Sequence, residues 1–193
     1  PTQHEVDDLR EEWKEQLDKI LAREAAAATA SAEKLDRSVA NLSSIVAIAE
    51  AGGKTALLTG DARGDMILKW LGDTGRLDGE GKAHFDILKL PHHGSDRNVS
   101  LDFFRRITAD HYVVCGNGGH GNPEPATLAM LFEARPGLGF QLYMTYGPDE
   151  LKQNRKFKKV GNVPRLDEVL SHPGREDVLR FPGEGETFVE IVV

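Results

Sequence analysis

The sequence has few of the residues that cross-link a chain or carry it through a membrane. Among its 193 residues there is one cysteine, Cys115, which excludes an internal disulfide and a zinc site built from several cysteines. No apolar run reaches the roughly eighteen residues of a membrane span, and Pro1 to Glu5 lack the basic-then-apolar pattern of a signal peptide. We therefore expect a cytoplasmic protein that makes no contact with a membrane.

The sequence also has fewer basic than acidic residues. With 24 basic and 31 acidic residues the formal net charge is -7, which disfavours a broad nucleic-acid-binding face, although a local pocket can still be basic. The chain length and the hydrophobic content of 39% suit one soluble globular domain with its own core. Since cysteine is nearly absent, any metal must be held by histidine and aspartate.

Residues 1–40 are predicted to form an amphipathic helical segment. From about Glu5 to Leu35 the stretch is charged and rich in alanine, and apolar residues recur in it at helical spacing. These residues are Val6, Leu9, Trp13, Leu17, Ile20 and Leu21. Such a stripe covers a core or a partner subunit, so it is given no chemical role.

From residue 41 onward, short apolar runs alternate with helical patterns. This alternation predicts a layered α/β architecture. The expected elements are a β-hairpin at 44–59 with its turn at 51–54, helices at 65–71, 101–107, 126–134 and 166–170, and strands at 85–90, 111–115, 140–145 and 188–193.

Three loops that follow strands carry the candidate functional residues, and the first contains Asp61. It comes directly after the apolar run Leu57–Thr59 and Gly60, which leaves its carboxylate free to face a cleft. The alternative is that Asp61 caps the helix that follows, as aspartate commonly does.

The second loop contains the adjacent histidines His92 and His93 at the end of a strand. If the backbone stays extended, the two side chains point to opposite sides, so one can enter a cleft while the other packs. Neutral imidazole is a preferred metal ligand, which favours metal binding or catalysis. Ser95 or Asp96 is expected to cap the helix near Ser100 or to shape the turn.

The third loop, Gly116–Pro125, surrounds His120 with glycines that allow the backbone to approach a ligand closely. The alternative is a flexible turn in which His120 is merely exposed. The remaining histidines have weaker contexts and are expected to be structural or solvent-facing. They are His4, His84, His111 and His172.

Together the three loops resemble the metallo-β-lactamase superfamily, in particular the hydrolase domain of ComEC-type DNA-uptake competence proteins. The matching segments occur in the family's order and lie within about residues 41–145; they are 41–46, 57–61, 88–95 and 116–123. The resemblance implies that residues 41–193 form the C-terminal half of a metallo-β-lactamase-like αββα sandwich with a mixed β-sheet. The amphipathic segment 1–40 precedes this half-domain.

The resemblance also implies roles for four residues. Asp61 is expected to bridge two divalent ions, zinc or manganese, and either His92 or His93 to bind one of them. The other histidine of the pair and His120 are expected to hydrogen-bond the substrate or the developing oxyanion. In such sites the metals generate a hydroxide that attacks a phosphoryl or acyl centre. A small phosphoester or a nucleic acid is the expected substrate.

One departure from the family is large, because the chain has no match to its His-x-His-x-Asp-His motif. Two or three ligands do not complete a dinuclear site, so the isolated chain is expected to be inactive. An N-terminal half of the fold, on the same or a separate chain, would supply the rest, unless the domain has lost its chemistry. We also expect the isolated chain to form homo-oligomers that cover the uncovered surface.

Two other functions stay open. A non-catalytic binding or assembly module could pair through its sheet edge or its N-terminal helix. A metal-independent phosphate-binding domain could use the backbone amides of Gly116–Gly121.

Overall fold

The computed structural model describes residues 35–154 and 165–193. Residues Asp36–Val193 form one compact unit. The predicted amphipathic helix of residues 1–40 lies almost wholly outside the described residues, so it stays a prediction. No helix of the described part is long and apolar enough to cross a membrane.

The unit is built on one six-stranded sheet whose strands lie side by side in chain order. The strands are β1 (Ala47–Ala51), β2 (Lys54–Leu58), β3 (Ala83–Lys89), β4 (Ile107–Val114), β5 (Gln141–Met144) and β6 (Leu179–Arg180). β1 is antiparallel to β2, and every later pair is parallel. The predicted hairpin and the predicted α/β class with a mixed sheet are confirmed.

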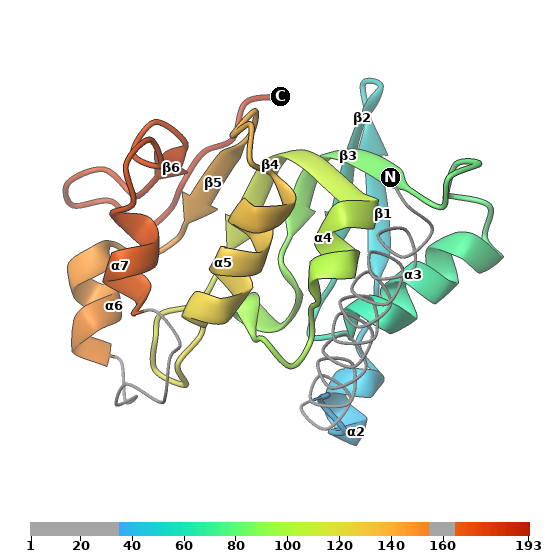
Figure 1. Ribbon diagram of the computed structural model, residues 1–193, viewed down its shortest axis with the longest axis horizontal. Helices are drawn as coiled ribbons and strands as arrows, with labels where there is room; N and C mark the ends of the chain where they lie inside the picture. The colour runs from blue at the N-terminus through green and yellow to red at the C-terminus, as the bar shows by residue number, and fades with distance from the viewer. Residues whose placement is uncertain (1–34, 155–164) are drawn as a thin grey trace, which may run out of the picture. The chain divides into compact units, whose positions relative to one another are not determined.

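The connections between the parallel strands are mostly helical, as parallel pairing requires. The helices are α2 (Val39–Leu42), α3 (Gly64–Asp73), α4 (Leu101–Arg106), α5 (Pro125–Ala134), α6 (Pro148–Asn154) and α7 (Leu166–Leu170), with a short 3-10 segment, η1 (Pro91–Gly94). Figure 1 shows α3, α4 and α5 on one face of the sheet.

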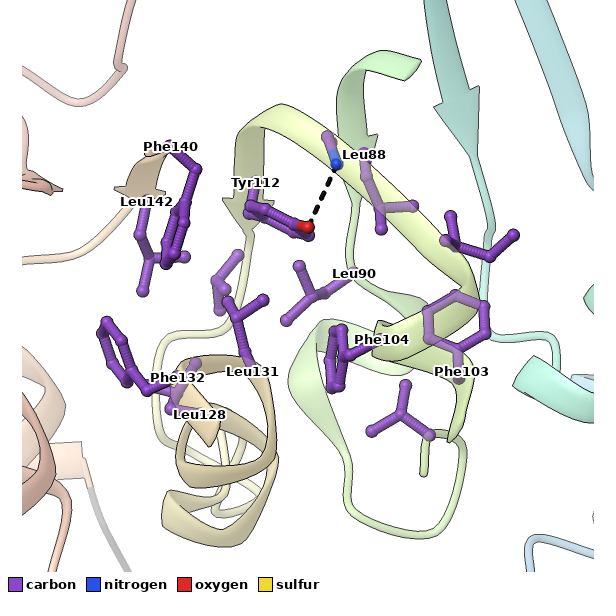
Figure 2. Close-up of a cluster of buried hydrophobic side chains, with 14 of the residues drawn as sticks. Leu88, Leu90, Phe103, Phe104, Tyr112, Leu128, Leu131, Phe132, Phe140 and Leu142 are labelled. Atoms are coloured by element: carbon purple, nitrogen blue, oxygen red, sulfur yellow. Dashed lines mark hydrogen bonds between the residues drawn. The ribbon is translucent and has the colours of Figure 1, made fainter. Parts of the chain in front are cut away.

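The core lies between that face and the helices. Leu57, Leu88, Tyr112 and Leu142 are paired across four neighbouring strands, so they project from the same face, and all are 0% exposed. Figure 2 shows Leu88, Tyr112 and Leu142 beside the side chains of α4 and α5. The helix residues in this layer are Phe103, Phe104, Leu128, Leu131 and Phe132. The Tyr112 hydroxyl accepts a hydrogen bond from the backbone of the strand (3.0 Å), which satisfies this buried polar atom.

The residue that caps helix α4 is Ser100, and not Ser95 or Asp96. Its hydroxyl accepts a hydrogen bond from the backbone N–H of Phe103 at 3.1 Å. Ser95 instead accepts one from the N–H of Arg97 at 3.3 Å, so it shapes the preceding turn. Of the two predicted roles for Ser95 or Asp96, helix capping is therefore wrong, and turn formation holds for Ser95.

The predicted strand at 188–193 does not form. The edge of β5 pairs instead with Leu179–Arg180, which comes earlier in the chain. Phe188 is 59% exposed and Val192 82% exposed, so the apolar run of this segment is not used to bury a face. A short apolar run is consistent with a strand but does not by itself secure a partner strand.

Candidate functional site

The three predicted loops leave the sheet at one edge, because β2, β3 and β4 are parallel neighbours. We call them the aspartate loop (59–63), the His-His loop (90–96) and the glycine loop (116–125). In α/β sheets this carboxyl-terminal edge is where functional groups usually gather.

Asp61 lies on the turn that follows β2. Gly60 has a φ of +52°, which favours glycine, and its carbonyl accepts the backbone N–H of His92 at 3.0 Å. Asp61 itself donates its backbone N–H to Ser44 Oγ at 3.1 Å, while its carbonyl accepts from Asn98 Nδ2 at 2.9 Å. The N-cap of α3 is Arg63, so the alternative in which Asp61 caps this helix is wrong.

The backbone at the histidine pair is not extended, contrary to the expectation from the strand end. His92 has φ 45° and ψ 47°, and His93 has φ 57° and ψ 21°, both in the left-handed region. The chain turns there because the His92 carbonyl accepts the N–H of Ser95 at 3.1 Å. A left-handed conformation costs a residue other than glycine about 1–2 kcal/mol, and such strain is concentrated at functional sites.

His93 is the histidine that lies beside Asp61. Its Nε2 is 3.7 Å from Asp61 Oδ1, its Nδ1 is buried, and its ring interacts with the backbone of Cys115. Burial lowers the pKa of His93, and the positive charge of Lys89 lowers it further. The imidazole is therefore neutral at neutral pH, the form in which histidine binds metals.

His92 belongs to a different network. Its Nδ1 is 3.0 Å from Asn98 Oδ1 and 3.3 Å from Asp36 Oδ2. The same nitrogen lies 3.4 Å from Asn41 Nδ2, so His92 is held among three polar side chains. Burial raises the pKa of Asp36, but hydrogen bonds from Asn41, Ser38 and Asn98 outweigh it and hold the pKa below its ordinary value. His92 therefore ties the segment before α2 to the His-His loop.

The glycine loop packs tightly against the His-His loop. Asn122 Nδ2 donates to the His92 carbonyl at 3.0 Å, and the N–H of Glu124 donates to the Gly94 carbonyl at 2.9 Å. A Cβ added to Gly116 would lie 2.6 Å from the Asn122 carbonyl oxygen and 3.0 Å from that of His93. Gly116 is therefore required by contact between the two loops.

His120 is not brought to the other candidates. Its side chain is exposed on the glycine loop. In the part of the chain that the structure describes, no hydrogen bond or ion pair joins it to Asp61, His92 or His93. All four predicted site residues thus lie on loops at one edge of the sheet, and His120 makes no polar contact with the other three in the described structure.

Two residues of this edge had been missed. Glu124 accepts the backbone N–H of Asp96 at 2.9 Å, and burial together with the neighbouring Asp96 carboxyl raises the pKa of Glu124 to about 7. Lys89, the last residue of β3, donates from Nζ to the Gly60 carbonyl at 2.9 Å. A lysine that ends an apolar strand just before two histidines was a usable signal, whereas no sequence pattern marks the Glu124–Asp96 contact.

The spacing of His93 and Asp61 can be compared with the geometry of a zinc site. Tetrahedral zinc with bonds of about 2.0–2.1 Å places its ligands about 3.3–3.4 Å apart, close to the 3.7 Å between His93 Nε2 and Asp61 Oδ1. The Nε2 atom of a neutral imidazole and a carboxylate oxygen are suitable donors for zinc, so the pair fits. Within residues 35–154 and 165–193, no three His, Cys, Asp or Glu side chains gather as a metal-holding group.

A second His–Asp pair lies near the amino ends of β3 and β4. His84 Nε2 is 3.5 Å from Asp110 Oδ1, and His84 Nδ1 is 2.8 Å from Thr108 Oγ1. These side chains and residues 134–140 line a depression of about 340 Å³. None of the predicted site residues borders it.

No family model matches the chain, and no solved structure matches it. A stretch of 93 residues, 48% of the chain, is 36% identical to human microtubule-associated protein 1A. The rat and mouse proteins of the same name are 37% and 38% identical over 67 residues, 34% of the chain. The matched stretches span 3% of the length of the human protein and 2% of the rat and mouse proteins.

Proposed function

We propose that the chain is the C-terminal half of a metallo-β-lactamase-like, metal-dependent hydrolase, and that Asp61 and His93 are metal ligands. The observation that carries the proposal is the 3.7 Å approach of His93 Nε2 to Asp61 Oδ1 across two parallel strands. The sequence resemblance of residues 41–145 supports it, because both residues lie in its matching segments. A cytoplasmic location is part of the proposal.

The two histidines have different roles in this proposal. His93 faces Asp61 and serves as the ligand, while His92 holds the His-His loop through Asn98 and Asp36. A bound zinc or manganese pair would polarise a phosphoester and activate water. His120, exposed on the glycine loop, remains available to hydrogen-bond the substrate. Further ligands must come from outside the described residues, since two donors leave a zinc site open.

A sheet face whose central side chains are only partly buried supports the idea of a half-fold. Strand alternation places Ile87, His111 and Gln141 on the face opposite Leu88 and Tyr112, and all three are only partly buried. His111 Nδ1 and Gln141 Oε1 are buried atoms without a hydrogen-bond partner among the described residues. We assign this surface to an N-terminal half of the fold, with self-association of the isolated chain as its substitute.

Titration calorimetry of the purified chain with zinc and with manganese tests the proposed ligands. Asp61→Asn and His93→Gln should each weaken binding at least about tenfold, since even loss of an outer hydrogen-bond partner commonly costs that much. His84→Gln and Asp110→Asn alter a pair of similar spacing and should leave affinity unchanged. Equal metal affinity in all four variants would contradict the proposal.

A second candidate function is a non-catalytic binding or assembly module. The similarity to microtubule-associated protein 1A, named for its association with microtubules, favours it. Cosedimentation of the purified chain with stabilised microtubules tests one such role. Binding that persists with a chelator and in Asp61→Asn would support the module, whereas a chain that stays in the supernatant would contradict microtubule binding.

A further inference from the structure

Lys89 differs from the other lysines whose side chains the structure describes. Lys54, Lys69 and Lys82 are each paired with a carboxylate within 3.0 Å, and their side chains are at least half exposed. Lys89 is partly buried, and no carboxylate of the described residues forms an ion pair with it. Its ammonium therefore lies beside the candidate site, where the charge of Asp61 acts on it from beyond the distance of an ion pair.

The position of Lys89 is fixed from two directions. Its carbonyl accepts the Thr59 hydroxyl at 2.7 Å, which joins the ends of β2 and β3. Its Nζ donates to the Gly60 carbonyl at 2.9 Å, and the same carbonyl accepts the backbone N–H of His92. The ammonium is thus held between the aspartate loop and the His-His loop, adjacent to Asp61.

One acceptor leaves most of the donor capacity of Lys89 unused. An ammonium has three N–H donors, and the Gly60 carbonyl takes one of them. The charge of Lys89 acts on the His93 ring and on the Cys115 thiol, so it faces the same edge as the proposed metal ligands. Lys89 is partly buried, and this burial lowers the pKa of its ammonium.

We infer that Lys89 binds an anionic oxygen of the substrate, a phosphoryl oxygen, next to the Asp61–His93 pair. A compact ammonium with free donors in a partly dehydrated site suits a tetrahedral oxyanion. As a substrate contact this inference rests on the proposed function, and it favours a phosphoester over a neutral acyl substrate. As an anion site it depends only on Lys89 and its neighbours.

Binding of inorganic phosphate to the purified chain tests the inference. Calorimetry measures this binding in the presence and in the absence of zinc. Lys89→Met should weaken phosphate binding about tenfold or more, because it removes charge-assisted hydrogen bonds. Lys89→Arg keeps the charge and should restore most of the affinity. Lys82→Met, just before the other end of β3, removes the same charge and should change affinity less than twofold.

A direct measurement guards against a Lys89→Met variant that fails to fold. In the wild-type chain, the side-chain Cε resonance of Lys89, assigned by its loss in Lys89→Arg, should shift on phosphate titration. An unshifted resonance, no phosphate binding by the wild type, or equal binding by folded Lys89→Met would overturn the inference. The proposed function fails separately, if Asp61→Asn and His93→Gln leave metal affinity unchanged while phosphate binding still requires Lys89.

Discussion

Two His–Asp pairs lie near opposite ends of the parallel strands, the first after β2 and β3 and the second on β3 and β4, and their spacings are nearly equal. His93 and Asp61 approach to 3.7 Å at the carboxyl ends, and His84 and Asp110 to 3.5 Å near the amino ends. The first pair is less exposed, at 45% and 35% of side-chain area against 57% and 55%. Distance alone therefore does not distinguish a metal site from an exposed ion pair.

The surroundings of the two pairs differ more than their spacing. His84 lies on a regular strand, with Nδ1 satisfied by Thr108. His93 lies on a left-handed turn, with its Nδ1 buried and its ring interacting with the backbone of Cys115. Backbone strain and a partly buried imidazole at one pair are features expected at a functional site.

The largest predicted effect is on the free energy of unfolding, and it differs between the loops at the carboxyl ends of the strands and those at the amino ends. Gly116→Ala places a Cβ 2.6 Å from a backbone oxygen, so it should lower the free energy of unfolding by about 1–3 kcal/mol. Gly139→Ala, in the loop lining the other depression, meets nothing within 4 Å and should change it by less than about 0.5 kcal/mol. Urea denaturation measures both, and equal effects would show that the loop contact is not tight.

The next prediction reverses sign between the two histidines. At His93, Gly should be more stable than Ala by about 1 kcal/mol, because the backbone is left-handed. At His84, inside β3, Gly should be less stable than Ala by about 0.5–1 kcal/mol. Thermal denaturation of the four variants decides this, and an Ala preference at both positions would rule out the left-handed turn.

The third prediction concerns pH. The folded-state pKa of Glu124, about 7, lies above its ordinary value of 4.5, because burial and the Asp96 carboxyl favour the protonated form. Between these values the folded state retains a proton that the unfolded chain has released, so stability falls as pH rises from about 4.5 to 7. After allowance for the partial exposure of this carboxyl, the loss should be about 1 kcal/mol at most.

Glu124→Gln is the matched variant for this effect. This variant should not lose stability as the pH rises, so its free energy of unfolding should change less between pH 5 and 7. Urea denaturation at several pH values in this range measures the effect. Asp86, whose pKa is lowered to about 2 by Lys54 and Thr55, should contribute a constant amount over this range. An unchanged slope in Glu124→Gln would show that another group causes it.

The smallest effect is expected at the exposed pair. Asp110→Asn should change the free energy of unfolding by less than about 0.5 kcal/mol, since solvent-exposed ion pairs contribute little. Denaturation in low and high salt measures it. A loss above about 1 kcal/mol would mean that the His84–Asp110 pair is more than a surface contact.

Much of the fold was predictable because its signals are local. Sequence patterns located the hairpin and four of the helices, α3, α4, α5 and α7, and the predicted bounds of α7, Leu166–Leu170, agree with the structure. The short helices α2 and α6 were not predicted, and the strand that pairs with β5 is Leu179–Arg180 instead of 188–193. β4 also begins at Ile107, four residues before its predicted start, because its amino end pairs with Ala83 and His84 of β3.

The candidate site was predictable only in part. The residue types and their places after strands pointed to Asp61, His92 and His93, which the parallel sheet brings to one edge. The left-handed turn at the histidines depends on contacts with Gly60 and the glycine loop, which are distant in sequence. The choice between the two histidines needed the side-chain partners of each, so sequence alone left it open.

The most direct test of the account is a nitrogen-resolved NMR spectrum of the histidine rings before and after one equivalent of zinc. The account predicts that His93 Nε2 moves to the position of a metal-bound nitrogen, that this change is lost in Asp61→Asn, and that His84 does not move. Zinc that left His93 unchanged, or that shifted His84 equally, would contradict the claim that Asp61 and His93 form part of a metal site.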